Sequence, residues 1–150
     1  MIYRATTDWD DCKAYHQKTN NIPDTITIIK TKKGNIFVGF THIKIPSCQY
    51  GTNFHDENAF LFSLDHKKLY LSLKNEDSKH SNDSYGPIFG NNKKGYPIIV
   101  NGYNFFKSSG STCVKENGVY NNFEFDYELN KGDMNFEINE IEVFQILFEE

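Results

Sequence analysis

Apolar and polar residues recur with two different periods along the chain. Over residues 9–16 the apolar positions follow helical spacing, and Thr7 precedes a group of aspartates that suits the positive end of a helix dipole. We expect one helix with Thr7 as its N-cap, ending near Thr19 and Asn20 because Pro23 follows closely. From residue 25 onward the period is two, which is typical of half-buried strands.

A first hairpin is predicted by the two alternating segments after the helix. Residues 25–31 are rich in β-branched side chains, which suit a pleated surface. Residues 36–40 restart the alternation after Gly34, which can take a positive φ in a short loop. The apolar phase has changed by Ile43, so we expect a bulge or bend around residues 41–42.

A second hairpin is predicted further along the chain. Residues 59–64 are apolar on both faces, the pattern of a strand buried between two layers. Residues 69–73 alternate after a polar turn and supply the partner strand. The stretch before this hairpin, residues 46–58, has no clear period and is expected to be an ordered surface loop.

The second half of the chain mixes polar, glycine-rich stretches with short apolar runs. We expect a structured loop over residues 75–95, short strands at 98–100 and 103–106, and a further loop over 108–118. In residues 123–129, aromatic residues and a leucine alternate with acidic residues and an asparagine. This alternation predicts a half-buried antiparallel strand.

The last apolar run, residues 136–146, changes phase between Ile138 and Ile141, so we expect a strand with a bulge. Together these elements predict a mainly β (β-rich α+β) chain. Its expected architecture is a two-layer antiparallel β-sandwich with one or two flanking helices. A length of 150 residues fits one domain over residues 1–150.

Composition and charge limit the expected cell compartment and the expected classes of partner. We find no run of about 18 apolar residues and no secretory signal at the start, so we expect a cytoplasmic protein without direct membrane insertion. The net charge is −4 and the acidic excess lies after Phe123, which makes nucleic acid a poor partner. Three widely spaced cysteines support neither a disulfide framework nor a clustered zinc site, and they favour a reducing compartment.

Several segments resemble, in the same order, those of the TLDc domain family of oxidation-resistance proteins. The segments are Tyr3-Arg4-Ala5, Tyr15-His16, Thr27-Ile28-Ile29-Lys30 with Gly34, Phe37-Val38-Gly39-Phe40, and residues 58–64, 84–90 and 139–144. Each is common by itself, but their shared order spans nearly the whole chain. The resemblance implies a two-sheet sandwich, a role in resisting oxidative stress and, for several members, binding to the vacuolar proton-pumping ATPase.

From the resemblance we expect a TLDc-like, non-catalytic protein-interaction domain without a cofactor, metal or catalytic residues. Its expected partner is the vacuolar ATPase or another complex linked to oxidative stress, and the oligomeric state is left open. Contact residues are expected in a glycine-aromatic loop and on acidic strand positions, because an acidic face can steer a basic partner. The candidates are Ser84, Tyr85, Gly86, Phe89, Gly90, Glu124, Asp126, Glu128, Glu140 and Glu142.

A thiol-dependent antioxidant enzyme or a hydrolase is the alternative. Cys48 and His55 share the irregular stretch before the second hairpin, where exposure would permit reaction, and an exposed Cys113 would be open to oxidation. No nucleophile signature surrounds these residues. Cys12 falls on the apolar side of the predicted helix and is expected to fill the core.

Other candidate chemistry has a structural explanation. Glu140 and Glu142 share one face of the last strand, whereas acid and base catalysis needs carboxylates placed across a cleft. Residues 84–90 lack the lysine and hydroxyl ending of a P-loop, so their glycines are expected to permit tight turns. The histidines show no close pairing that would build a metal site on one element.

Overall fold

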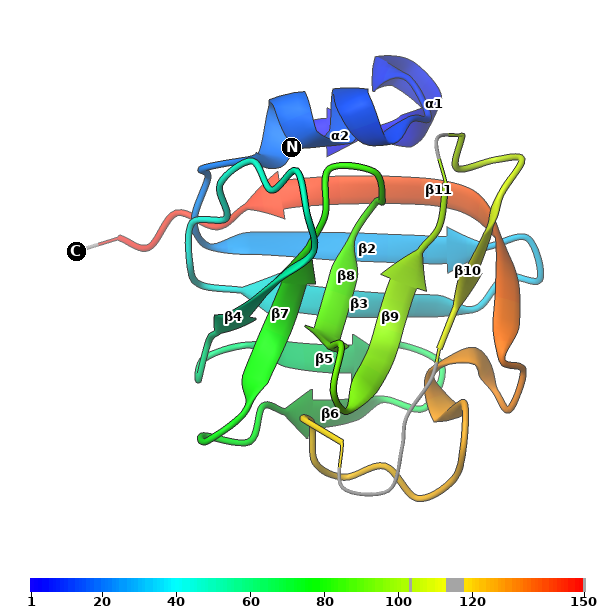
Figure 1. Cartoon of the computed structure of the whole chain (residues 1–150). Coiled ribbons are helices and arrows are strands. Elements are labelled where there is room, and N and C mark those ends of the chain that lie inside the picture. The colour runs from blue at the N-terminus through cyan, green and yellow to red at the C-terminus, as the bar shows by residue number, and fades with distance from the viewer. Residues whose placement is uncertain (103, 113–117, 150) are drawn as a thin grey trace.

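The chain folds as two antiparallel β layers that face each other. The computed structural model describes residues 1–102, 104–112 and 118–149. Figure 1 shows the strands of one layer crossing those of the other at a steep angle, with α1 and α2 together at one end. The predicted mainly β sandwich with flanking helices is confirmed.

Each layer has its own set of strands. The first sheet contains β1 (Tyr3–Arg4), β11 (Asn135–Gln145), β2 (Thr25–Thr31), β3 (Ile36–Thr41), β5 (Phe60–Ser63) and β6 (Lys68–Leu71). The second sheet contains β4 (Thr52–His55), β7 (Asp77–Ser81), β8 (Ile88–Asn91), β9 (Gly95–Val100) and β10 (Ser109–Ser111). The start of β11 pairs with β10 and its remainder pairs with β2, so β11 joins the two layers.

The register of β11 contains the predicted irregularity. Ile138 lies opposite Thr31, and Glu140 lies opposite Lys30, with a register shift between them. The bulge predicted between Ile138 and Ile141 is therefore confirmed. It keeps Ile138 and Ile141 both turned into the core, because one extra residue restores the alternation.

Large side chains fill the space between the layers. Tyr3, Phe37, Tyr70, Phe89 and Phe105 are all fully buried. Several rings meet edge to face, including Phe37 with Phe136 at 5.1 Å between centroids, a preferred geometry for aromatic pairs. The core thus depends on aromatic residues contributed by both sheets.

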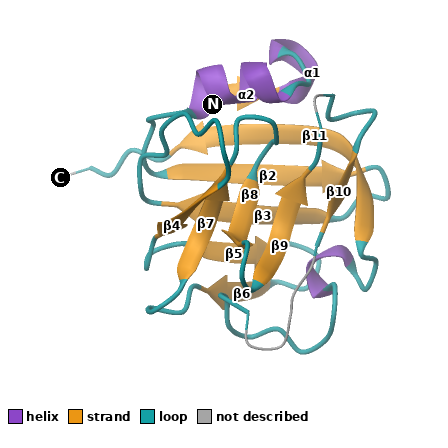
Figure 2. Ribbon diagram, viewed as in Figure 1, coloured by secondary structure: helices purple, strands orange, loops and turns teal. Residues whose placement is uncertain are grey.

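The first helical segment differs from the prediction of one helix capped by Thr7. It forms two short helices, α1 (Ala5–Asp8) and α2 (Cys12–Thr19), which Figure 2 shows at one end of the sandwich. Trp9 separates them because its φ of 78° is not helical. The Asp11 side chain caps α2 by accepting a hydrogen bond from the Ala14 backbone N–H at 2.7 Å.

The first hairpin is confirmed, since β2 pairs with β3 and Gly34 has a φ of 90°. So is the second, in which β5 pairs with β6. The irregularity expected around residues 41–42 is the end of β3 at Thr41. The stretch 46–58 is not all loop, because it contains β4.

The polar half of the chain is more regular than the sequence indicated. Residues 75–95 contain β7 and β8, and β10 lies within the predicted loop 108–118, of which residues 113–117 lie outside the described residues. The predicted strand 98–100 is the end of the longer β9. No strand forms in the described part of 103–106.

The prediction of a strand over residues 123–129 is wrong. The segment is irregular and ends in the short 3-10 helix η1 (Glu128–Asn130). Asn122, Tyr127 and Lys131 all have φ values between 53° and 73°, which a strand does not allow. The alternation of aromatic and acidic residues therefore belongs to an irregular segment and not to a pleated strand.

Replacing Gly39 with alanine is expected to destabilise the fold. A Cβ atom at Gly39 would lie 2.4 Å from the ring of Phe89 across the sandwich, and the ring is buried among core residues. We expect a loss of about 1–3 kcal/mol in unfolding free energy, measured by urea denaturation.

The matched control is the double variant Gly39→Ala with Phe89→Leu. Shrinking the ring removes the clash, so the two losses should sum to more than the double variant shows. Strictly additive losses would contradict the proposed close packing.

Candidate functional site

The glycine-aromatic segment 84–90 is placed mostly inside the protein. Ser84 is exposed and Tyr85 half-buried, whereas Gly86, Phe89 and Gly90 are buried. Phe89 packs over Gly39, and a Cβ at Gly90 would lie 2.3 Å from the Gly95 carbonyl oxygen. Only Ser84 and Tyr85 of this segment reach solvent, and its contact role stays a prediction.

α2 holds this segment in place through His16. The Nε2 atom of His16 lies 2.8 Å from the carbonyl oxygen of Tyr85 and 3.1 Å from that of Asn82. Asp83 accepts hydrogen bonds from the Cys48 backbone N–H at 2.8 Å and from the Ser47 hydroxyl at 2.6 Å. Two loops far apart in sequence are thus fixed beside the helix.

The three predicted acidic contact residues of 124–128 separate into two environments. Glu124 and Asp126 are exposed, whereas Glu128 is only 2% exposed. Glu128 accepts hydrogen bonds from Tyr70 Oη and, at 3.1 Å, from Lys68 Nζ. Because it is buried, Glu128 anchors η1 on β6 instead of facing solvent.

The charge of Glu128 is maintained by its partners. Burial raises the pKa of this carboxyl, but the hydrogen bonds from Tyr70, Lys68 and the Glu124 backbone N–H outweigh that effect, and the net pKa lies below its usual range. Burial, together with the same carboxylate, raises the pKa of Tyr70 far above its usual range. The pair is a tyrosine donating to an ionised carboxylate.

Glu140 and Glu142 face the outside of the first sheet near β1. Glu140 accepts hydrogen bonds from Arg4 Nε at 3.3 Å and from the Thr6 hydroxyl at 2.5 Å. Glu142 lies opposite Arg4 on one side and Ile28 on the other. Glu140 therefore holds the N-terminal segment on β11, whereas Glu142 has no ion-pair partner among the described residues.

A buried lysine that sequence reasoning did not single out lies on β7. Lys79 is 5% exposed, and its Nζ donates to the carbonyl oxygens of His80 and Ile88 at 2.9 and 2.7 Å. The ammonium group also lies 4.9 Å from the centre of the Phe89 ring. Burial lowers the pKa of Lys79 to about 7, because a charged ammonium loses its hydration.

Cys48 and His55, the candidate nucleophile pair, do not contact each other. Cys12 and Cys48 are both buried, and burial raises the pKa of Cys12. Cys48 Sγ lies 3.3 Å from the Pro46 carbonyl oxygen, whereas His55 is paired at 4.0 Å with Asp77, so the two take different partners. Cys113 lies outside the described residues.

Metal ligands and membrane spans were also sought. Among the described residues, no group of three or more His, Cys, Asp or Glu side chains is placed to hold a metal ion. Within the same residues, no helix is both long and apolar enough to cross a membrane.

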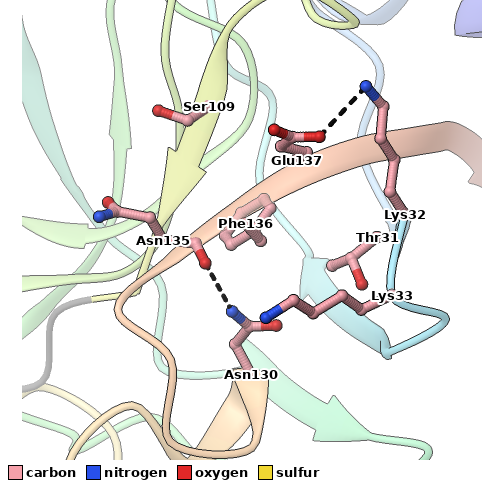
Figure 3. A pocket seen from close by; sticks show the side chains of 8 residues that line it. All are labelled: Thr31, Lys32, Lys33, Ser109, Asn130, Asn135, Phe136 and Glu137. Atoms are coloured by element: carbon pink, nitrogen blue, oxygen red, sulfur yellow. Dashed lines mark hydrogen bonds and ion pairs between the residues drawn. The ribbon is translucent and has the colours of Figure 1, made fainter.

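A cavity of about 410 Å³ lies between the turn after β2 and the start of β11, as Figure 3 shows. Asn130 forms part of its wall by donating to the carbonyl oxygens of Asp133 and Asn135 at 2.9 and 3.0 Å. Lys32 and Glu137 form an exposed ion pair at 3.2 Å across the opening. The buried Asn130 amide is engaged in holding the loop, and such exposed pairs contribute little binding energy.

Glu128→Gln is expected to lower the unfolding free energy by about 1–3 kcal/mol at neutral pH, because it removes the charge from a buried hydrogen-bonded group. The folded pKa of Glu128 is depressed, so its stabilisation is present above the unfolded value of about 4.3 and is lost as the pH falls through the folded value. The difference between the two proteins should therefore shrink in acid. Urea denaturation over a pH series measures it.

Glu124→Gln is the matched control for Glu128→Gln. The Glu124 side chain is 76% exposed and also pairs with Lys68, so its loss is expected to change stability by less than about 0.5 kcal/mol. Equal effects of the two substitutions would contradict the anchoring role of Glu128.

Lys79→Met is expected to flatten the dependence of stability on pH in the alkaline range. The folded pKa of Lys79 is about 7 and an unfolded lysine has about 10.4, so between these values the unfolded state binds more protons. The unfolding free energy of the unaltered chain should therefore rise with pH, by about 1 kcal/mol per pH unit, relative to Lys79→Met.

Lys93→Met, at an exposed position, serves as the control for Lys79→Met and should leave the slope unchanged. Denaturation curves between about pH 7 and pH 10 provide the measurement. Parallel pH profiles for the chain with and without Lys79 would show that this lysine is charged inside the protein.

Comparison with known proteins places the whole arrangement in a family. A family model described as the TLDc domain matches residues 1–147 of the chain. A search of curated proteins returned no match. Because the match extends from β1 to the tail that follows β11, it covers both sheets and both helices described above. The chain therefore belongs to the TLDc domain family, whose segments the sequence resembles.

Proposed function

We propose that the chain is a non-catalytic protein-interaction domain linked to oxidation resistance, and that its partner is the vacuolar proton-pumping ATPase. The observation that carries the proposal is membership of the TLDc domain family over residues 1–147. In support of a structural rather than catalytic use of the charged groups, Lys79, Asp83 and Glu128 each hold strands or loops together through hydrogen bonds.

The exposed part of the acidic segment is the favoured contact. Glu124 and Asp126 are exposed on an irregular segment that Glu128 anchors on the first sheet, and Glu124 also pairs with Lys68 at 3.2 Å. A net charge of −4 for the whole chain adds to their attraction for a basic surface. Ser84, which is exposed, and Tyr85, which is half-buried, provide a second candidate position.

The thiol-enzyme alternative has less support from the structure. A reactive thiol needs access and a depressed pKa, whereas both described cysteines are buried and the pKa of Cys12 is raised. Peroxide consumption by the purified chain, compared with a Cys48→Ser and Cys113→Ser double variant, distinguishes the two functions. Consumption that exceeds buffer and is lost in the double variant would favour the enzyme.

Immobilised chain is expected to capture the purified cytosolic sector of a vacuolar ATPase at low salt. Charge reversal at Glu124 and Asp126 should reduce capture about tenfold, because like charges then face each other across the contact. Binding is measured by surface plasmon resonance at two salt concentrations, since a steered contact weakens in salt.

Glu137→Lys is the control for a general effect of charge, because Glu137 is exposed on the far end of β11 and pairs only with Lys32 among the described residues. It should retain most of the capture. Failure of the folded, unaltered chain to bind the ATPase sector would remove the pump from the proposal. Equal capture by all variants would remove the acidic contact.

A further inference from the structure

A small cavity lies where α2 covers one end of the sandwich (Figure 1). Its volume is about 20 Å³, and its walls come from α2, β2, β3, β7 and β11. A single water needs roughly 10–15 Å³, so the cavity has room for one small solute. Four buried polar residues line it, each at most 7% exposed, namely Thr25 and Thr27 of β2 and Lys79 and Ser81 of β7.

The hydroxyl groups of this lining are available to a guest. The Thr41 hydroxyl also belongs to the lining, but it donates to Asp56 at 2.6 Å. The side chains of Thr25, Thr27 and Ser81 form no hydrogen bond within the described part of the chain. Because a buried hydroxyl without a partner is unfavourable, these three side chains favour a polar guest.

Lys79 decides the charge of that guest. A protonated amine has three N–H donors, and two of them are used by the carbonyl oxygens of His80 and Ile88 at 2.9 and 2.7 Å. The neutral amine has only two N–H groups, which these carbonyls satisfy. Protonation therefore adds a donor and a positive charge, and no carboxylate of the described residues forms an ion pair with Lys79.

Two ionisable side chains near Lys79 offset the effect of burial only in part. Burial lowers the pKa of Lys79, and the neighbouring Cys48 and Asp56 act in the opposite direction but leave the net value at about 7. Both oxygens of Asp56 already accept hydrogen bonds, Oδ2 from the Thr41 hydroxyl at 2.6 Å and Oδ1 from the Asn58 N–H at 3.1 Å. Asp56 is therefore not a direct partner of the ammonium group.

Other titratable groups lie on the helix side of the cavity and on β7. Tyr15 lines the cavity and stays neutral, because burial raises its pKa to about 12. Both ring nitrogens of His16 are hydrogen-bonded, with Nε2 at 2.8 Å from the Tyr85 carbonyl oxygen. His80 follows Lys79 on β7 and points to the opposite side of the strand. Lys79 is thus the lining residue whose protonation leaves a donor unpaired.

We infer that this cavity binds a single small monovalent anion of about the size of chloride, held by the hydroxyls of Thr25, Thr27 and Ser81 and by the third N–H of Lys79. Hydroxyl and ammonium donors replace the water that an anion loses on entry, and the ammonium group disfavours a cation in the same place. The inference goes beyond the proposed interaction role and does not depend on it.

Anion binding at this site is coupled to proton binding. The anion supplies the countercharge that favours protonated Lys79, and protonated Lys79 in turn favours the anion by the same factor. With a Lys79 pKa of about 7, the amine is mostly charged at about pH 6 and mostly neutral at about pH 9. The apparent dissociation constant for chloride should therefore rise about a hundredfold between these two pH values.

The test compares thermal unfolding of the whole chain in potassium chloride and in potassium gluconate at equal ionic strength. Gluconate is too large for the cavity, and equal ionic strength removes the general effect of screening. At about pH 6, each tenfold rise in chloride above its dissociation constant should raise the Tm by roughly 3–5 °C. The same chloride concentrations should change the Tm by less than about 1 °C at about pH 9.

Three variants assign the response to the cavity. Lys79→Met keeps the length of the side chain and removes its charge, so the chloride response should disappear at both pH values. Thr27→Val keeps the shape and removes one hydroxyl, and it should weaken chloride binding about tenfold. Lys93→Met, at an exposed position, is the matched control and should respond as the unaltered chain does.

A direct observation does not depend on the folding of any variant. Crystals of the unaltered chain grown in sodium bromide should show an anomalous bromide peak among Thr25, Thr27 and Lys79. A cavity that contains only water would overturn the inference, as would a chloride response of equal size at both pH values. A pH-dependent response that Lys79→Met retains would also overturn it and assign the effect to His16, which that variant keeps.

Discussion

The sandwich depends on aromatic rings lying directly against glycine backbone. The ring of Phe89 covers Gly39 across the two layers, and that of Phe136 covers Gly110 on the neighbouring strand. In both places a Cβ atom would approach the ring to 2.4 Å or less, so no other residue fits without displacing it. Since each buried ring removes a large apolar area from water, rings placed in this way stabilise the core.

Polar anchors then fix the segments that the aromatic core does not reach. Glu128 binds η1 to β6, and Glu140 binds the N-terminal segment to β11. A buried carboxylate stabilises only when its oxygens are hydrogen-bonded, and both of these are. Lys79 represents the opposite case, because its neighbours are carbonyl groups and an aromatic ring rather than a counter-ion, and burial lowers its pKa. Glu128 is thus a buried carboxylate that its partners hold charged, whereas Lys79 is a buried amine whose charged form is disfavoured by burial.

The regular hairpins could be predicted from the sequence because their alternation, the glycine turn and the β-branched residues all agree. Residues 77–81 could not, since Asp77-Ser78-Lys79-His80-Ser81 contains no apolar residue and only its tertiary environment makes it a buried strand. The strand prediction for residues 123–129 failed for the opposite reason. Their alternation is strong, but Tyr127 adopts a left-handed conformation and Glu128 turns inward to Tyr70, contacts that only the folded chain supplies. The sequence also could not predict that the contact candidates Phe89 and Gly90 are buried, because glycine-aromatic segments occur both in loops and in cores.

The same reasoning explains why β2 is informative about the surface. Its alternation predicts a strand whichever face is buried, and only the structure shows that three threonines and Ile29 occupy the inner side. Inside, Thr25 and Thr27 line a small cavity that Lys79 also lines. Ile29, which is fully buried, lies in the same inner row of β2. Ile26 and Ile28 lie on the outer side and are half-buried, because the register places Ile26 between Phe144 and Phe40 and Ile28 beside Val38, and cross-strand apolar neighbours cover one another.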